Sequence, residues 1–231
     1  MTSWTVRAWF LALFLLVGCL GPEPAEGEVG EQTQFLGAGG DGGGPGCPSG
    51  GVGPGCVACF GTQHDLTIDS RTPTVGSSLD PVCWVDGSPE MSCLLRWDVS
   101  AIPTNATVTG AQVTVSVVDG SLANYYAKRV IRPWLEAEAS WLNANALSSW
   151  AIAGAKSFTD RDPSTVFAFS GNSGVHTATL TSTGLAAVQA WINSATANWG
   201  VIIPSSDTHR MGISSKEGAF SPRLCVSYTT P

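Results

Sequence analysis

Alternation of apolar and polar residues is the main pattern in the chain. Between Ala111 and Val117, alanine and valine alternate with the polar residues Gln112, Thr114 and Ser116. Successive side chains of a β-strand point to opposite faces, so this pattern predicts a strand with one buried face. Similar runs predict further strands at 94–99, 126–131, 165–169, 176–180, 199–203 and 224–228. Turn-forming pieces such as Asp119-Gly120 separate them.

Many short strands divided by polar turns are typical of two packed sheets. We therefore predict an all-β protein with a jelly-roll-type β-sandwich. One segment has a helical period, because Leu185, Val188 and Trp191 or Ile192 recur after Ser182 and Thr183, which can cap a helix. One short helix is expected there, packed across an end or edge of the sandwich.

The N-terminal residues have the pattern of an export signal. Arg7 precedes an apolar run from Ala8 to Val17. This run is shorter than the roughly 20 residues that span a bilayer, and it matches the hydrophobic region of a signal peptide. The ending Leu16-Val17-Gly18-Cys19 resembles the lipobox of bacterial lipoproteins, in which the cysteine is acylated. Residues 1–19 are thus predicted to be a lipoprotein signal peptide with lipidation at Cys19; an ordinary secretory signal is the alternative.

The next stretch, residues 20–59, is dominated by glycine and proline with scattered glutamates. It lacks the apolar residues that would repay ordering, so we predict a flexible tether. Residues 60–231 are long enough for one domain with a core of its own. Together these segments predict a secreted, extracellular domain, held by lipid at the bacterial outer membrane or cell surface, with no other membrane contact.

Charge argues against a nucleic-acid partner. The chain carries a formal net charge of -7, and residues 60–231 hold 13 acidic and 10 basic residues. Phosphate binding needs a concentrated basic surface, which the pair Lys128 and Arg129 is too small to provide.

The cysteine count is consistent with export. Of the 7 cysteines, six remain if Cys19 takes a lipid. An even number in an exported chain predicts three disulfides, with the pairing left open. The alternative, a redox pair or half of a zinc site at Cys56 and Cys59, lacks the second ligand pair that zinc needs. The disulfide candidates are Cys47, Cys56, Cys59, Cys83, Cys93 and Cys225.

Several motifs follow one another in order between about Asp65 and Tyr228. They are Leu94 to Pro103 leading into Ala106 to Ala111, Arg129 to Glu136 with Ser140-Trp141, Leu185 to Trp191, Asn198 to Val201, Ser214 to Glu217, and Pro222 to Tyr228. Together they resemble the DNRLRE domains, some of which are classed as family-96 carbohydrate-binding modules. The usual Ser-Arg-Glu motif is Ser215-Lys216-Glu217 here, which loses the bidentate guanidinium. The resemblance implies a β-sandwich fold and carbohydrate binding.

A sugar-binding surface needs flat aromatic faces and polar groups that bind paired hydroxyls. Trp134, Trp141 and Trp199 lie inside the family-like pattern and are expected in the core. Tyr125, Tyr126 and Trp150 lie in or beside loops, and we predict them as exposed platforms. Lys128 and Arg132, four apart in a strand, would share one face and contact an acidic polysaccharide, unless they only pair with Glu136 or Glu138.

No cofactor or dedicated metal site is predicted. A structural calcium ion is a weak option, its candidate ligands being Asp98, Asp119, Asp160 and Asp162. No catalytic motif is recognisable, although Glu136 with Glu138, or Glu217 with a distant aspartate, would suit an acid and base pair. We therefore expect a non-enzymatic carbohydrate-binding module whose partner is a polysaccharide or cell-surface glycan. The alternatives are a structural or adhesive surface module and an accessory domain with unrecognised activity in polysaccharide degradation.

Overall fold

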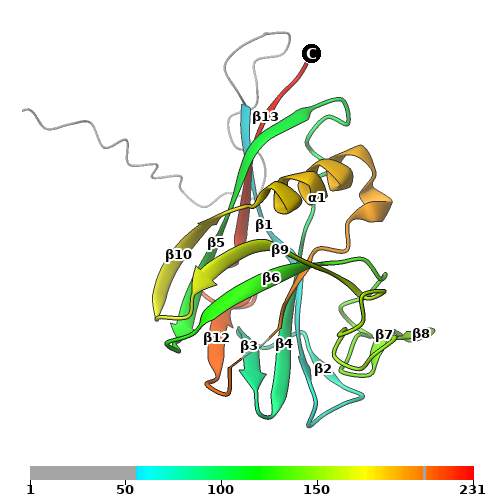
Figure 1. Cartoon of the computed structure of the whole chain (residues 1–231), viewed down its shortest axis with the longest axis vertical. Helices are drawn as coiled ribbons and strands as arrows, with labels where there is room; N and C mark the ends of the chain where they lie inside the picture. Colours follow the sequence, from blue (N-terminus) through cyan, green and yellow to red (C-terminus); the bar gives the residue numbers. More distant parts are fainter. Residues whose placement is uncertain (1–55, 205–206) are drawn as a thin grey trace, which may run out of the picture. The chain divides into compact units, whose positions relative to one another are not determined.

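The structure is a computed structural model that describes residues 56–204 and 207–231 (Figure 1). Strands dominate this part of the chain, together with one α-helix, α1 (Ser182–Asn193), and a short 3-10 helix, η1 (Ala195–Ala197). The strands are, in chain order, β1 (Cys56–Asp69), β2 (Gly76–Ser77), β3 (Val82–Gly87), β4 (Glu90–Trp97), β5 (Thr107–Asp119), β6 (Asn124–Val130), β7 (Asn143–Asn145), β8 (Ser148–Ser149), β9 (Arg161–Ser170), β10 (Gly174–Thr179), β11 (Val201–Pro204), β12 (Met211–Ser214) and β13 (Arg223–Thr229).

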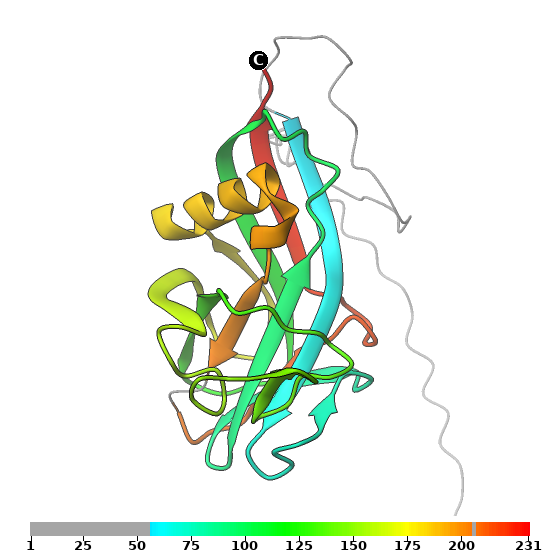
Figure 2. The same cartoon turned by 90° about the vertical axis from the view of Figure 1, so that its right-hand side faces the viewer.

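Two layers of antiparallel strands are joined by strands that belong to both. The first half of β1 pairs with β13, and its second half pairs with β4 (Figure 2). Likewise, β3 pairs with β12 along most of its length and with β4 at its end. The ladder through β1, β13, β5, β12, β3 and β4 therefore closes on itself as a barrel. The strands β11, β6 and β9 extend one layer from β4, and β10 extends the other from β5.

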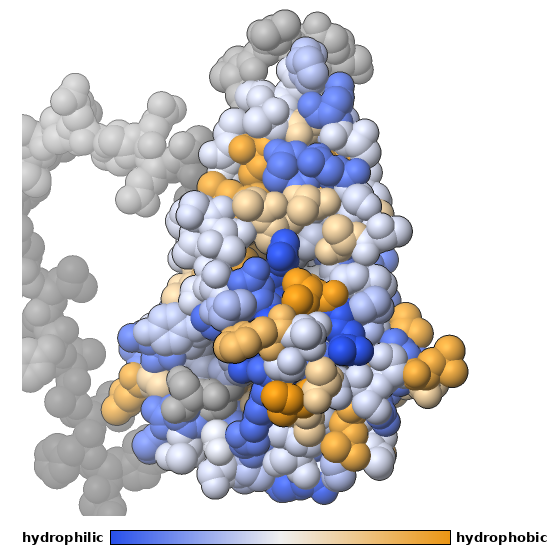
Figure 3. All heavy atoms as spheres, turned by 45° about the vertical axis from the view of Figure 1, so that its right-hand side comes forward, coloured by the Kyte–Doolittle hydropathy of each residue, from blue (hydrophilic) through white to orange (hydrophobic). Residues whose placement is uncertain are grey.

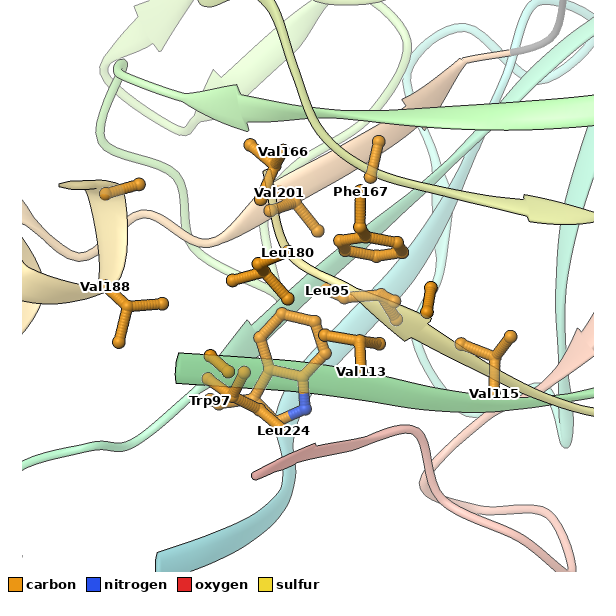
Figure 4. Close-up of a cluster of buried hydrophobic side chains, with 14 of the residues drawn as sticks. Leu95, Trp97, Val113, Val115, Val166, Phe167, Leu180, Val188, Val201 and Leu224 are labelled. Atoms are coloured by element: carbon orange, nitrogen blue, oxygen red, sulfur yellow. The ribbon is translucent and has the colours of Figure 1, made fainter. Parts of the chain in front are cut away.

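The main core lies between the layers and is built by the inward residues of the alternating strands (Figure 4). Val113, Val115 and Val117 of β5 are buried in it, as their spacing predicts. Trp97 is one of two tryptophans buried there, and its indole Nε1 donates a 3.1 Å hydrogen bond to the carbonyl of Pro222. The buried indole of Trp97 thus keeps its polar atom satisfied, whereas the Nε1 of Trp191 in the same core has no partner among the described residues.

Helix α1 covers one end of this core and packs against β5 and β9 (Figures 1 and 2). Its inward face includes Val188, Trp191 and Ile192, as the period predicts. The cap is Thr181 rather than Ser182 or Thr183: its hydroxyl accepts a hydrogen bond from the backbone N–H of Gly184.

The predicted all-β class and single α-helix are confirmed. Strand β1 begins at Cys56, four residues before the predicted start of the domain, and pairs there with β13. The N-terminal 55 residues, which include the predicted signal peptide, Cys19, most of the tether and Cys47, lie outside the described residues.

Two of the expected disulfides are formed between described cysteines. Cys59 is bonded to Cys225 across β1 and β13, and Cys83 is bonded to Cys93 across β3 and β4. Cys56 is disulfide-bonded as well. Cys56 and Cys59 are therefore structural cysteines, and the alternative of a redox pair or half of a zinc site at these two residues is wrong. Within the described residues, no helix has the length and apolarity needed to cross a membrane.

Candidate functional site

A long connection between β6 and β9, residues 131–160, folds over the outer face of the layer that contains β4 and β11. It builds a second core there, with Leu94 and Ile202 pointing outward from the strands to meet it. The large side chains that this connection contributes are Trp134, Trp141 and Trp150. The expected burial of Trp134 and Trp141 is confirmed, and Trp199 packs half-buried at the border.

Two of the three predicted aromatic platforms are buried, so that part of the prediction is wrong. Trp150 is 4% exposed, because the connection folds back and its Nε1 donates to the carbonyl of Ser140. Tyr125 is 1% exposed; it faces the main core, and its hydroxyl lies 2.8 Å from the Ser121 hydroxyl. Tyr126, the next residue along β6, points outward and is 45% exposed, as predicted.

The predicted shared face of Lys128 and Arg132 is also wrong, because β6 ends at Val130. Lys128 donates to the carbonyl of Pro163 and the hydroxyl of Thr165. Arg132 instead pairs with the fully buried Asp160 at 2.5 Å. Both cations are therefore engaged within the protein.

A charged network lies where β1, the long connection and the loop after β12 meet. The carboxyl of Asp65 on β1 is 2% exposed, and burial raises its pKa to about 7. The backbone N–H of Lys216 donates to it at 2.6 Å, and the Asp65 N–H donates to Glu136 at 2.9 Å. The ammonium of Lys216 pairs with Glu136 and Glu217. The distant aspartate near Glu217 is therefore Asp65.

Hydrogen bonding outweighs the effect of burial on the pKa of Glu136. Burial alone would raise its pKa, but hydrogen bonds from Lys216, the Asp65 N–H and His64 lower it overall. The same carboxylates hold the pKa of Lys216 above its ordinary value despite burial. Beside them, the Arg96 guanidinium lies over the rings of Trp134 and Trp199, at 5.3 and 5.7 Å from their centroids. This network ties β1, β4 and the connection to the loop after β12.

The network includes the one group of three acidic side chains that lie within metal-binding distance in the described part of the chain, namely Asp65, Glu136 and Glu217. The Lys216 ammonium already pairs with two of these carboxylates. None of the four aspartates considered for calcium belongs to this group. Asp119, Asp160 and Asp162 each pair with a different arginine, and Asp98 accepts from the Ser100 N–H.

The candidate binding site is a hollow near the β3–β4 hairpin. Its cavity volume is about 40 Å³, and it is partly open to solvent. Strands β3, β4, β9 and β11 and the long connection line it with Asp86, Glu90, Met91, Ser92, Trp141, Gly154, Lys156, Arg161 and Pro204. Drug-sized pockets occupy about 300 to 1,000 Å³, so this hollow is too small to enclose a sugar and offers only a shallow place of contact for part of a ligand.

The hollow is lined by both hydrogen-bond donors and acceptors. The Lys156 ammonium lies 2.6 and 2.5 Å from the two carboxylate oxygens of Glu90, and 5.3 Å from the ring centroid of Trp141. Asp86 is buried and accepts from the Ser88 N–H. Burial lowers the pKa of Arg161, and the negative charge of Asp160 offsets part of this decrease. The Arg161 Nη1 has no hydrogen-bond partner among the described residues.

Gly154 lines the hollow and contacts Trp141. This residue has a φ of 77°, and a Cβ there would lie 2.5 Å from the Trp141 ring. Its N–H donates to the carbonyl of Trp141 at 2.7 Å. Glycine therefore allows both the left-handed turn and the close approach of the ring.

Sequence reasoning missed the hollow because its polar residues come from separate segments that carry no common motif. Glu90 and Lys156 are 66 positions apart, and neither stands in a recognisable motif. Only the fold of the 131–160 connection brings them together. No protein-family model matches the chain, and no curated protein matches it either.

Proposed function

We propose that this protein is a non-catalytic carbohydrate-binding module that works outside the cell. The observation that carries the proposal is the hollow around Trp141. Sugars offer an apolar ring face and many hydroxyls, and they are bound by an aromatic surface with nearby planar or charged hydrogen-bonding groups. The hollow is lined by Trp141, whose ring is mostly buried, together with two carboxylates, Asp86 and Glu90, and two cations, Lys156 and Arg161.

The charge balance of the hollow favours hydroxyl groups over a charged ligand. Asp86 and Glu90 accept hydrogen bonds, whereas Lys156 and Arg161 donate them. A hydroxyl both donates and accepts, so one sugar residue is able to satisfy both kinds of group. The Glu90–Lys156 pair is itself exposed, and such pairs contribute only about 0 to 1 kcal/mol, so a ligand displaces their mutual contact at small cost.

Location outside the cell is supported by the disulfides. Bonds such as Cys59–Cys225 and Cys83–Cys93 form and persist in oxidising compartments. In this proposal Cys19 carries the lipid, and the Gly/Pro-rich segment after it links the lipid to the domain. Replacement of Cys19 by serine should release the exported protein from membranes; a variant that stays membrane-bound would argue against the lipid anchor.

A second candidate function, an adhesive module that binds protein, is favoured by exposed apolar side chains on the long connection. Leu147 is 98% exposed and Phe158 is 76% exposed, and Ile152 is exposed as well. Figure 3 shows apolar residues in separate patches among hydrophilic ones on one face of the molecule. Scattered apolar residues are common on soluble proteins, which makes this candidate the weaker one.

Affinity gel electrophoresis of the purified chain against a panel of neutral and acidic polysaccharides tests the main proposal. We expect retardation by at least one polysaccharide, and loss of about tenfold in affinity for Glu90→Gln and for Lys156→Met, since hydrogen bonds to charged groups contribute about 1.5 to 3 kcal/mol. Glu138→Gln, a change of an exposed carboxylate on the same connection, is the matched control. Absence of retardation by every polysaccharide would exclude carbohydrate binding.

A further inference from the structure

A row of three residues crosses the layer formed by β3, β12 and β5. Trp84 pairs with Gly212, and Gly212 pairs with Asp119. The neighbours Cys83, Val85, Met211 and Ile213 point into the main core. Trp84 and Gly212 therefore lie on the outer face of the layer.

The indole of Trp84 lies over Gly212. A Cβ on Gly212 would be 2.7 Å from the ring atom Cζ3 and 3.1 Å from Cε3. Any side chain at this position would push the ring away from the sheet. Because Gly212 has no side chain, the indole is able to lie close against the strand.

Arg210 completes the row. Its guanidinium carbon lies 4.1 Å from the ring centroid of Trp84, and its Nη2 lies 3.2 Å from Oδ2 of Asp119. The side chains of Arg210 and Asp119 are 51% and 45% exposed. An indole, a guanidinium and a carboxylate are consequently presented together on an open face.

Core packing does not account for this arrangement. Trp84 is half-buried and belongs to neither of the two core clusters, whereas Trp97, Trp134, Trp141, Trp150 and Trp191 are buried within them. The contacts that cover its outer side, a cation over a ring and an exposed ion pair, are weak and readily exchanged for ligand contacts.

We propose, on the basis of the proposed function, that this row is a second glycan-binding site and that it takes an internal segment of a neutral polysaccharide. The indole receives the apolar face of one sugar ring in place of the guanidinium. Arg210 then donates to the hydroxyls of that sugar, and Asp119 accepts from them. The Arg210–Asp119 pair has no net charge, which matches hydroxyls rather than carboxylates. The open face lets the chain continue in both directions, whereas the hollow near Trp141 is bounded.

The test compares variants of the full chain by affinity gel electrophoresis and calorimetry, with hydroxyethylcellulose and galactomannan as neutral probes and polygalacturonate as the acidic probe. We expect Trp84→Ala to lose about tenfold in affinity for a neutral probe, and Trp84→Tyr, which keeps a flat ring, to stay within about threefold. Phe158→Ala removes an exposed ring elsewhere and should leave the affinity unchanged.

Arg210→Met and Asp119→Asn keep the test informative if Trp84→Ala does not fold, because both side chains are exposed. Each should weaken neutral-glycan binding several-fold and leave thermal unfolding unchanged. If the wild type binds glycans and all variants of the row bind equally well, this site is wrong while the proposed function stands. Preference for polygalacturonate over both neutral probes would also overturn it. If the wild type binds no polysaccharide, both proposals fail.

Discussion

The backbone N–H of Lys216 donates a 2.6 Å hydrogen bond to the buried carboxyl of Asp65, which is 151 positions away in the chain. This bond fixes the loop after β12 against β1. Because the acceptor is a buried acid whose pKa is raised, the stability of the contact depends on pH.

The first prediction concerns that dependence. The pKa of Asp65 is about 7 in the folded protein against an ordinary value of 3.8. The folded state therefore holds this proton more tightly, and the group's contribution to stability falls as the pH rises from about 4 to 7. This difference between the folded and unfolded pKa values corresponds to about 4 kcal/mol of unfolding free energy. Asp65→Asn, which keeps an acceptor for Lys216, should remove this loss.

Urea unfolding of the wild type and Asp65→Asn at pH 5 and pH 8 measures the effect. The variant should gain stability relative to the wild type at pH 8. Glu136 acts in the opposite direction, since its lowered pKa gives stability that is lost as the pH falls through the folded value. Equal differences between the two proteins at both pH values would contradict the assignment to Asp65.

The second prediction compares the two disulfides. Cys59 and Cys225 are 166 positions apart, whereas Cys83 and Cys93 are 10 apart. Constraint of the unfolded chain increases with loop length, so the long loop should stabilise by about 5 kcal/mol and the short one by about 3 kcal/mol. Paired replacement of each disulfide by serine, followed by chemical denaturation under non-reducing conditions, checks the order. A greater loss from the short loop would show that native packing outweighs chain entropy.

The third prediction concerns Gly154. Alanine there meets a left-handed backbone and the Trp141 ring at once. We expect Gly154→Ala to lower the unfolding free energy by about 2 to 3 kcal/mol and to weaken glycan binding in the hollow. Gly110→Ala is the control, because a Cβ at Gly110 makes only ordinary contacts. Wild-type binding by a folded Gly154→Ala protein would place the sugar away from Trp141.

The fourth prediction concerns Asp160. Its carboxylate accepts from Arg132 and from the N–H groups of Ala151 and Ile152. Replacement by alanine leaves the cation and both donors without this acceptor, and should cost about 3 to 5 kcal/mol. Thermal unfolding measures the loss. The control is Lys128→Met, which removes a half-buried cation that donates to two neutral acceptors. It should lower the unfolding free energy by less than half as much. A similar loss for both variants would mean that the buried Asp160 contacts stabilise the fold no more than the Lys128 contacts do.

The strands with strict alternation were predictable because their burial is decided by one face of the strand. β5 is the clearest example, with Val113 and Val117 inside. In contrast, β1 was not predicted as a strand, since it changes partners from β13 to β4 along its length and no single period describes it. The strands β3 and β12 were also missed. They are short, and they form strands by pairing with each other, although they are distant in the sequence, when the barrel closes.

The candidate site was less accessible to sequence reasoning. Neighbouring residues on a strand face opposite sides, so Tyr125 and Tyr126 were never able to be platforms together; the alternation of Tyr125 with Ala127 was the available signal. Trp150 offered no local signal, since its burial depends on Ser140 and on the folding of the whole connection. Trp84 was overlooked because its ring lies over Gly212, which is adjacent in the sheet but far away in the sequence.

The pairing of the first and last strands also determines how the domain responds to force. β1 and β13 run antiparallel, so the chain enters at Cys56 beside Tyr228, close to where it leaves (Figure 1). Tension between these two points would separate β1 from β13 one residue pair at a time, starting from the pair of Cys56 and Tyr228. The fourth pair is Cys59 with Cys225, which is covalently joined. Peeling therefore stops there, and the load passes through the disulfide while the hairpin end that carries the hollow remains mechanically undisturbed.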